Sequence, residues 1–198
     1  MYKNFFKSIF DFVLAFLLLV LLLPIFIIII IAIKLNSKGS AFFVQERLAK
    51  NGAIFKIIKF RTMVEGAQSI GDGIRVTEGD NRITKIGAFL RSTSLDELPQ
   101  LINILKGEMS FVGPRPPLPF HPYNGIENYP VNFQKRFLLK PGITGLAQVR
   151  LRNSVSWDGR ILVDLEYIDK VSFIFDIKIL FLTMFSVVKK DNIYGDIK

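Results

Sequence analysis

The segment that decides the fold runs from Phe12 to Ile33 and reads FVLAFLLLVLLLPIFIIIIIAI. It contains no charged residue over its 22 positions. Coiled as a helix at about 1.5 Å per residue, it would extend about 33 Å, enough to cross the hydrocarbon core of a bilayer. A cleaved signal peptide does not fit, because the apolar run is too long and residues 34–38 lack a small-residue cleavage pattern. The sequence therefore predicts a membrane segment.

Two features of this segment bear on its topology. Pro24 lies near its middle, where it removes a backbone donor and is expected to kink the helix. Lysines flank both sides, Lys3 and Lys7 before the segment and Lys34 and Lys38 after it. Positive flanks on both sides favour a hairpin whose two ends stay in the cytoplasm. Length alone favours a kinked helix that crosses the membrane, so composition leaves both topologies open.

The composition of the chain limits its chemistry and its partners. Its 198 residues fit one compact domain. Cysteine is absent, which excludes disulfides, thiolate catalysis and cysteine-based zinc sites. The net charge of +9 indicates an anionic partner. Nucleic acid is disfavoured, because no zinc-finger, basic-zipper or RNA-recognition signature accompanies the charge, and the apolar segment favours lipid instead.

A β-hairpin is expected directly after the membrane segment. Residues 41–45 and 54–61 have strand patterns, and the dipeptide Asn51-Gly52 between them favours a turn. Lys59 and Arg61 are two residues apart, so on a strand both side chains would project from one face. Two fixed cations there could form a phosphate site, and a solvated hairpin edge is the plainer interpretation.

An acidic pair precedes the next amphipathic stretch. Residues 98–105 carry an apolar helical stripe, and Gly107 supplies a stop. A helix that begins with Asp96 as its cap avoids a conflict with Pro99, and it would place Asp96 and Glu97 at the positive end of the helix dipole. That position keeps a carboxylate ionised, as a nucleophile or metal ligand requires. For an isolated Asp-Glu pair, ordinary helix capping is the favoured interpretation.

A rigid arginine follows in the stretch SFVGPRPP, residues 110–117. Pro114 and Pro116 restrict the backbone on both sides of Arg115, so its guanidinium is presented with little conformational freedom. A guanidinium fork of this kind suits a phosphate or a carboxylate. A proline-rich turn that ends in an exposed arginine is the alternative.

The remaining chain is expected to be mostly helical. Residues 130–137 predict a short helix, and residues 140–145 a tight connection. Gln148 and Arg152 follow, and Asp164 falls on a further predicted helix. Residues 173–188 are strongly apolar but include Asp176, which favours an amphipathic helix on the domain or in the membrane interface over a second span.

The order of these motifs is informative as a set. It runs from the proline-broken membrane segment through KFRTM (59–63), RSTSLDELPQ (91–100), SFVGPRP (110–116) and KPGITG (140–145). Over nearly the whole chain this pattern resembles the monotopic phosphoglycosyl transferases, a bacterial sugar transferase family, in the form of its minimal stand-alone catalytic unit. The sequence departs from frequent family residues at Leu23, Leu146 and Leu151, so the identity of the sugar cannot be carried over.

The resemblance implies a function and a site. Such an enzyme transfers a sugar phosphate from a UDP-sugar to polyprenol (undecaprenyl) phosphate, releasing UMP through a covalent aspartyl-phosphosugar. It implies Asp96 as the nucleophile, Glu97 as its partner, and Mg²⁺ bound by both. The substrate-binding residues expected by position are Lys59, Arg61, Arg91, Pro114, Arg115, Pro116, Gln148, Arg152 and Asp164. A phosphohydrolase with water as acceptor, and a lipid-binding scaffold without activity, are the rival hypotheses.

The expected architecture is α+β. Residues 1–38 would form a re-entrant helix-break-helix anchor, and residues 39–198 a catalytic domain with a small β-hairpin and several short, interfacial helices. The resemblance places the protein in the inner (cytoplasmic) membrane, with the catalytic domain on the cytoplasmic side. The expected partners are the UDP-sugar, polyprenol phosphate and membrane lipid, and the sequence leaves open whether the chain forms a homodimer.

Overall fold

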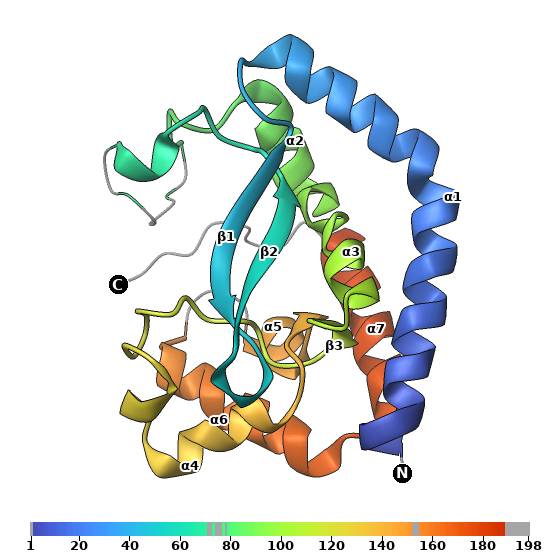
Figure 1. Ribbon diagram of the computed structural model, residues 1–198, viewed down its shortest axis with the longest axis vertical. Coiled ribbons are helices and arrows are strands. Elements are labelled where there is room, and N and C mark those ends of the chain that lie inside the picture. The colour runs from blue at the N-terminus through green and yellow to red at the C-terminus, as the bar shows by residue number, and fades with distance from the viewer. Residues whose placement is uncertain (1, 71–72, 74–76, 78, 152–154, 189–198) are drawn as a thin grey trace.

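The computed structural model describes residues 2–70, 73, 77, 79–151 and 155–188. It combines helices with two small sheets, which confirms the α+β prediction. Figure 1 shows a long N-terminal helix along one side of the molecule and a long β-hairpin beside it, with shorter helices packed below and between them. The helices are α1 (Lys7–Asn36), α2 (Lys85–Ser92), α3 (Gln100–Leu105), α4 (Val131–Gln134), α5 (Leu146–Leu151), α6 (Trp157–Lys170) and α7 (Phe173–Val188).

Short helical turns join these elements. A π-helical turn, η1, precedes α1, and several 3-10 turns interrupt the loops. They are η1 (Tyr2–Phe6), η2 (Lys50–Gly52), η3 (Ala67–Ser69), η4 (Leu95–Glu97), η5 (Ile126–Asn128) and η6 (Lys135–Leu138). The predicted helix over residues 130–137 is therefore present as α4 followed by the tighter turn η6.

Helix α1 contains the predicted membrane segment. It runs through Pro24 as one helix and changes direction midway along its length (Figure 1). Within the part of the chain that the structure describes, it is the one helix long and apolar enough to cross a membrane. One face packs on the domain in both halves, through Ala15 in the first half and Phe26 and Ile33 in the second. The opposite face leaves large apolar side chains such as Leu21 exposed, which indicates membrane association.

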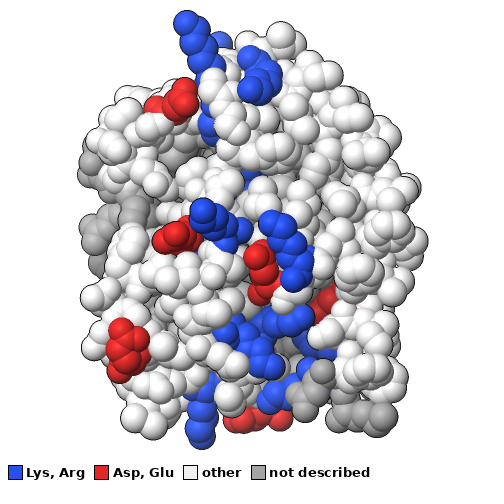
Figure 2. All heavy atoms as spheres, viewed as in Figure 1, with Lys and Arg blue, Asp and Glu red and all other residues white. Residues whose placement is uncertain are grey.

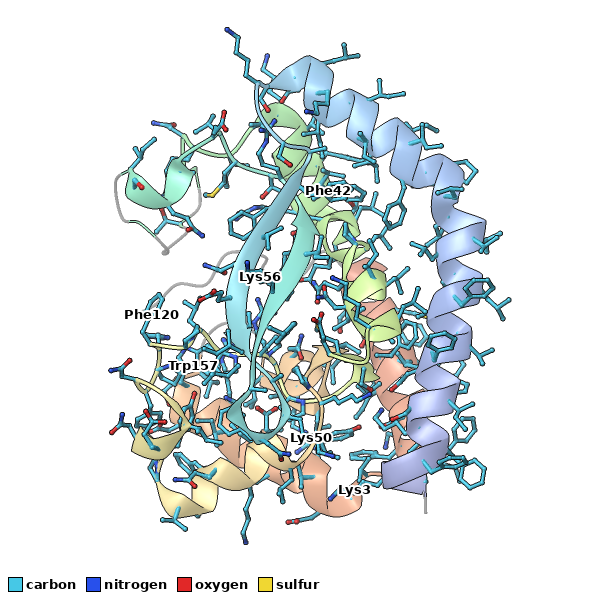
Figure 3. All side chains as sticks on the ribbon, viewed as in Figure 1. Lys3, Phe42, Lys50, Lys56, Phe120 and Trp157 are labelled. Carbon is cyan, nitrogen blue, oxygen red and sulfur yellow. The ribbon has the colours of Figure 1, made fainter. Side chains whose placement is uncertain are left out.

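The β-hairpin pairs β1 (Phe42–Leu48) with β2 (Ile54–Phe60) in antiparallel register. Asn51 and Gly52 both adopt left-handed backbone angles in the turn, as the Asn-Gly prediction requires. Figure 3 shows Phe42 near the end of α1 and Lys50 at the far turn, close to the helices at the base of the molecule. The hairpin thus connects the membrane helix with the base of the domain.

A second sheet was not expected from the sequence. Strand β3 (Ser110–Val112) pairs in parallel with β4 (Gly142–Thr144), within the stretch predicted to be a plain connection. The backbones of these two segments approach so closely that a Cβ atom on Gly113 would lie 2.4 Å from the carbonyl oxygen of Lys140. This close approach anchors the loop that carries Arg115, since that loop begins where β3 ends.

The start of α3 differs from the prediction. The helix begins at Gln100, after Pro99, and Asp96 lies instead in the 3-10 turn η4. The prediction that Asp96 caps the helix is therefore wrong. The physical reason is that Pro99 has no N–H and sits at the start of the helix, where that donor is not needed, so the preceding turn is a separate element. The acidic pair is held by η4 and its surroundings.

Candidate active site

The acidic pair meets a lysine from the hairpin. The Nζ atom of Lys59, on β2, donates a hydrogen bond to Oε1 of Glu97 at 2.5 Å. Both side chains are largely buried, with 18% of Lys59 and 23% of Glu97 exposed. Since an ion pair in a partly desolvated place is screened less than one on the surface, Lys59 fixes the position of the Glu97 carboxylate.

The backbone before the pair is unusual. Ser94 adopts a left-handed conformation, with φ of 56°, and its side chain makes no capping hydrogen bond. For a residue with a side chain this conformation carries strain, and strain of this kind gathers at functional sites. It interrupts the helical backbone between α2 and η4, the turn that carries Asp96 and Glu97.

The two carboxylates differ in proton affinity. Burial raises the pKa of Asp96 from its usual 3.8 to about 6, while the positive charge of Lys59 acts in the opposite direction. Burial also acts to raise the pKa of Glu97, but Lys59 and then Arg115 outweigh it and hold that pKa below its usual value. At neutral pH both groups are ionised, so both can act as acceptors, metal ligands or nucleophiles.

Two arginines lie near the pair, Arg91 acting on Asp96 and Arg115 on Glu97. Arg91, near the end of α2, donates from Nε to the Thr62 hydroxyl at 2.8 Å. Arg115 lies near Glu97 and also near Arg47 of β1, whose pKa falls to about 10 through burial and then through repulsion by Arg115. Figure 2 shows Lys and Arg side chains with a few acidic ones over the middle and lower part of the face that it views, and around the acidic pair itself the cations Lys59, Arg91 and Arg115 outnumber the two carboxylates. This excess of fixed cations suits an anionic ligand.

A pocket of about 400 Å³ opens beside Glu97, and Asp96 is not among its lining residues. Glu97, Ser94 and Arg91 form part of its polar lining, and α1 contributes Leu18 and Leu22 to its apolar lining. Further lining residues come from α2, the end of η4, α3, β3, β4, α5 and α7, and they are Ser92, Leu98, Leu101, Phe111, Ile143, Thr144, Gln148, Val149, Thr183 and Ser186. The pocket therefore lies between Glu97 and Arg91 on one side and the membrane helix on the other.

The sequence-predicted residues fall into three groups. Lys59, Arg91, Arg115 and the Asp96–Glu97 pair come together, and Gln148 lines the same pocket with its Nε2 bound to the Ile143 carbonyl at 2.8 Å. Pro114 and Pro116 flank Arg115 and contribute backbone carbonyls to the packing of the loop. Arg152 lies outside the residues that the structure describes.

Two other candidates have different partners. The Arg61 guanidinium donates to the carbonyl and hydroxyl oxygens of Ser37, both at 2.9 Å. It therefore holds the chain just after α1, whereas Lys59 binds Glu97. The reason is that β2 ends at Phe60, and the alternation of a strand does not extend to Arg61. Asp164 is buried against Arg136, with 2.8 Å between Oδ2 and Nη2.

The residues fit a shared metal ion. Across the described ranges no group of three or more acidic, histidine or cysteine side chains could hold a metal alone. Mg²⁺, however, is commonly bound by one or two carboxylates together with substrate phosphates. The ionised Asp96–Glu97 pair matches that donor set.

Sequence reasoning missed Arg47 and Arg136. Both contact the loop around Arg115, and neither belongs to a motif that was singled out. A signal for Arg136 was present, since it falls three residues after Phe133 and next to Phe137 in a predicted helix. That spacing places it on the apolar, buried face.

Fold and site together define a membrane-associated α+β protein with a carboxylate pair among fixed cations. The chain matches the model of the bacterial sugar transferases over residues 2–190. It belongs to that family, which confirms the resemblance seen in its motifs.

Several curated relatives match most of this chain. A protein of Escherichia coli named UDP-glucose:undecaprenyl-phosphate glucose-1-phosphate transferase is 44% identical over 170 residues, covering 78% of this chain and 34% of the relative. A Caulobacter vibrioides protein of the same name is 42% identical over 169 residues, covering 83% and 62%. A Salmonella typhimurium protein named undecaprenyl-phosphate galactose phosphotransferase is 39% identical over 170 residues, covering 79% and 35%. The chain spans about a third of the length of several curated relatives.

Proposed function

We propose that this protein transfers a sugar phosphate from a UDP-sugar to polyprenol phosphate and releases UMP. One observation carries the proposal: Glu97, which neighbours Asp96 and is ion-paired with Lys59, lines a pocket to whose apolar wall the membrane helix contributes Leu18 and Leu22. The names of the Escherichia coli and Caulobacter relatives, which specify transfer of glucose 1-phosphate to undecaprenyl phosphate, support it. The apolar wall favours a lipid acceptor over water.

The first step uses Asp96 as nucleophile. A carboxylate oxygen attacks the phosphorus that carries the sugar, and the bond from that phosphorus to the oxygen bridging the two phosphates breaks. UMP leaves with the bridging oxygen, and the sugar phosphate becomes joined to Asp96 as an acyl phosphate, a mixed anhydride. Phosphoryl transfer depends mainly on alignment and charge neutralisation, which Lys59, Arg91 and Arg115 can supply around the phosphate oxygens.

The second step returns the free carboxylate. An oxygen of polyprenol phosphate attacks the same phosphorus, and the bond to Asp96 breaks. The product is a polyprenol diphosphosugar. No proton has to move in either step, because the attacking and leaving groups are anions. The polyprenol chain would lie along Leu18 and Leu22 of α1, which places its phosphate toward Glu97.

Magnesium is part of the proposal. Asp96 and Glu97 would hold it, and when bound it would neutralise negative charge on the diphosphate. Chelation with EDTA should abolish UMP release, and added Mg²⁺ should restore it. Full turnover in EDTA would remove the metal from the proposal without affecting the nucleophile.

The re-entrant topology is also proposed here. Both halves of α1 pack on one domain, and both ends are tied to it, at Lys7 by Asp176 and at Ser37 by Arg61. To cross the bilayer, this helix would have to separate from the domain on which both of its halves pack, and this favours the re-entrant topology. We therefore place both ends, and the catalytic domain, on the cytoplasmic side of the inner membrane, where nucleotide sugars are made.

The absence of native cysteine makes the topology directly testable. Single cysteines at Lys3 and Lys38 should both react with a membrane-impermeant thiol reagent in inside-out vesicles, and neither should react in intact spheroplasts. A cysteine at Leu21 provides the lipid-buried control. Reaction of Lys3→Cys and Lys38→Cys from opposite sides would establish a spanning helix.

The nucleophile is tested by trapping. Protein in lipid nanodiscs, incubated with Mg²⁺ and a UDP-sugar labelled in the sugar, should retain about one label per chain, and polyprenol phosphate should discharge it. Asp96→Asn should retain none, whereas Glu46→Gln, an exposed acid on β1, should behave as wild type. Turnover by Asp96→Asn would exclude the mechanism, and sustained release of free sugar phosphate without lipid would identify a hydrolase. A panel of UDP-sugars then identifies the sugar.

A further inference from the structure

The loop of residues 114–117 has few backbone hydrogen-bond donors of its own. Three of its four residues are proline, so Arg115 has the only amide N–H among them. Every one of its four carbonyl oxygens nevertheless accepts a hydrogen bond from another part of the chain. The four bonds are Gly142 N to Pro114 O (3.0 Å), Arg136 Nη2 to Arg115 O (2.9 Å), Arg47 Nη1 to Pro116 O (3.1 Å) and Leu48 N to Pro117 O (3.0 Å).

Two of these four donors are guanidinium groups. Arg47 comes from β1 and Arg136 from η6, so the loop is gripped from two separate elements. Arg136 binds the carbonyl oxygen of the peptide between Arg115 and Pro116, and Arg47 binds that of the next peptide, between Pro116 and Pro117. Together they fix the backbone directly at the residue whose charge acts on Glu97.

Arg136 is deeply buried for a charged residue. Only 1% of its side chain and 3% of that of its partner Asp164 are exposed. The guanidinium also lies over the rings of Phe137 and Trp157, at 5.5 and 5.8 Å from their centroids. Its Nε and Nη1 atoms have no hydrogen-bond acceptor among the described residues. The Nη2 atom carries both of its hydrogen bonds, one to Asp164 and one to the carbonyl of Arg115.

Stability alone does not explain this arrangement. A buried ion pair is often replaced by apolar residues of similar volume with little loss of stability, because burial of the charges offsets their attraction. A directed hydrogen bond from Arg136 to the Arg115 carbonyl, in contrast, fixes geometry that apolar packing cannot. The pair therefore fits a role in orientation.

We propose that Arg136 and Arg47 are positioning residues that hold the main chain of residues 114–117, and thereby set where the Arg115 guanidinium stands relative to Glu97. Asp164 acts as the buried counterion that keeps Arg136 in place, and does not touch substrate. Where it concerns turnover, this inference rests on the proposed function.

The decisive variant replaces the pair without leaving a buried charge. Arg136→Met with Asp164→Leu should fold, with a Tm within a few degrees of wild type, but the Arg115 carbonyl loses its donor. A misplaced ionic group can cost up to about 100-fold, so we expect kcat/KM for the UDP-sugar to fall by about tenfold or more. Arg47→Lys keeps a charge near Pro116 and should lose activity in the same way.

A double-mutant cycle separates positioning from general structural damage. In an Arg115→Ala background, the paired replacement should lower kcat/KM further by less than about twofold, since its effect passes through Arg115. An equal loss in both backgrounds, or no loss in either, would overturn the proposal. The control is Arg150→Met with Glu166→Leu, an exposed ion pair that shares α6 with Asp164 and should leave kcat/KM unchanged.

Hydrogen exchange tests whether Arg47 and Arg136 hold the loop of residues 114–117, without any assay of activity. The amides of Leu48 and Gly142 donate to the two ends of the loop, so they should exchange faster in the paired replacement than in wild type. Unchanged exchange would overturn the positioning role even if turnover fell. If wild-type protein releases no UMP from any UDP-sugar, the proposed function fails. Hydrogen exchange still tests whether Arg136 and Arg47 position the loop.

Discussion

Lys59 and Glu97 form an ion pair between β2 and η4, with 2.5 Å between Nζ and Oε1. The two residues are 38 positions apart in sequence. The hairpin therefore does more than cover the domain, because it supplies the cation that holds one half of the carboxylate pair. Through Arg61 and Ser37, the same strand end is also tied to the membrane helix.

Replacement of Lys59 should test this pairing. In Lys59→Met, Glu97 keeps its burial but loses its main counter-charge, so its pKa should rise and its carboxylate should lose its fixed orientation. We expect UMP release to fall by about 100-fold or more, as when a fixed donor is removed from a transition-state site. The free energy of unfolding should fall by about 1–3 kcal/mol, the cost of an unpaired buried polar group. Both are measured at pH 7.5 in nanodiscs.

The same strand offers a matched control. Lys56 is exposed and lies three residues before Lys59, opposite Glu46 on β1. Lys56→Met should leave UMP release within about twofold of wild type, since exposed pairs contribute little. Equal losses in the two variants would show that UMP release depends on net charge and not on the Lys59–Glu97 contact.

The raised pKa of Asp96 predicts an effect of pH on stability. Its folded-state pKa of about 6 lies above the usual 3.8, so between these values the folded protein binds more protons than the unfolded chain. Stability from this group is thus present at low pH and is lost as pH rises through 6. In EDTA, Asp96→Asn should have a higher Tm than wild type at pH 8, and the difference should shrink by pH 5. A difference independent of pH would contradict this.

Local patterns made much of the fold predictable. The apolar run predicted α1, and the dipeptide Asn51-Gly52 predicted the hairpin turn. In each case, the residues that determine the structure are neighbours in the sequence. The Asp96–Glu97 pair and Arg115 stood out for the same reason, because their motifs are contiguous.

Long-range pairing was less accessible. The β3–β4 contact depends on two chain segments approaching at glycines, and Arg136 meets Asp164 across 28 positions. No local sequence pattern predicts which two buried charged residues form an ion pair. Asp164 was therefore expected at the substrate, although its carboxylate is directed at Arg136. The helix start after Pro99 was missed because a cap at Asp96 satisfied the local rules equally well.

The packing of α2 yields a prediction for Gly87. A Cβ atom there would lie 1.9 Å from the Thr62 carbonyl oxygen, so α2 must move away in Gly87→Ala. Arg91 shares this helix and binds the Thr62 hydroxyl, so it should leave the pocket. We expect a loss of at least about 1–3 kcal/mol in unfolding free energy, typical of overpacking, with a raised KM for the UDP-sugar well below the Tm. The exposed neighbour provides the control, since Ala88→Ser should change neither.

The first turn of α1 provides a test of how the membrane helix is held. The Nζ atom of Lys7 lies 2.6 Å from Oδ2 of Asp176 on α7, and the hydroxyls of Tyr2 and Tyr167 donate to the same carboxylate. Lys7→Met leaves a buried charge without its cation, so the unfolding free energy should fall by about 3–5 kcal/mol. Lys38→Met, at an exposed lysine beyond the other end, should not change it.

A second substitution distinguishes charge from contact at this place. Asp176→Asn in the Lys7→Met background removes the unpaired charge, while its amide oxygen still accepts from one of the two tyrosine hydroxyls, so most of the lost stability should return. The KM for polyprenol phosphate should remain raised in both variants, because the half of α1 that carries Leu18 and Leu22 is no longer fixed to the domain. The KM for the UDP-sugar should stay within about twofold, as its binding groups lie on the hairpin, α2 and the Arg115 loop. If both KM values rose together, α1 would be positioning the whole site and not the lipid-facing side of the pocket alone.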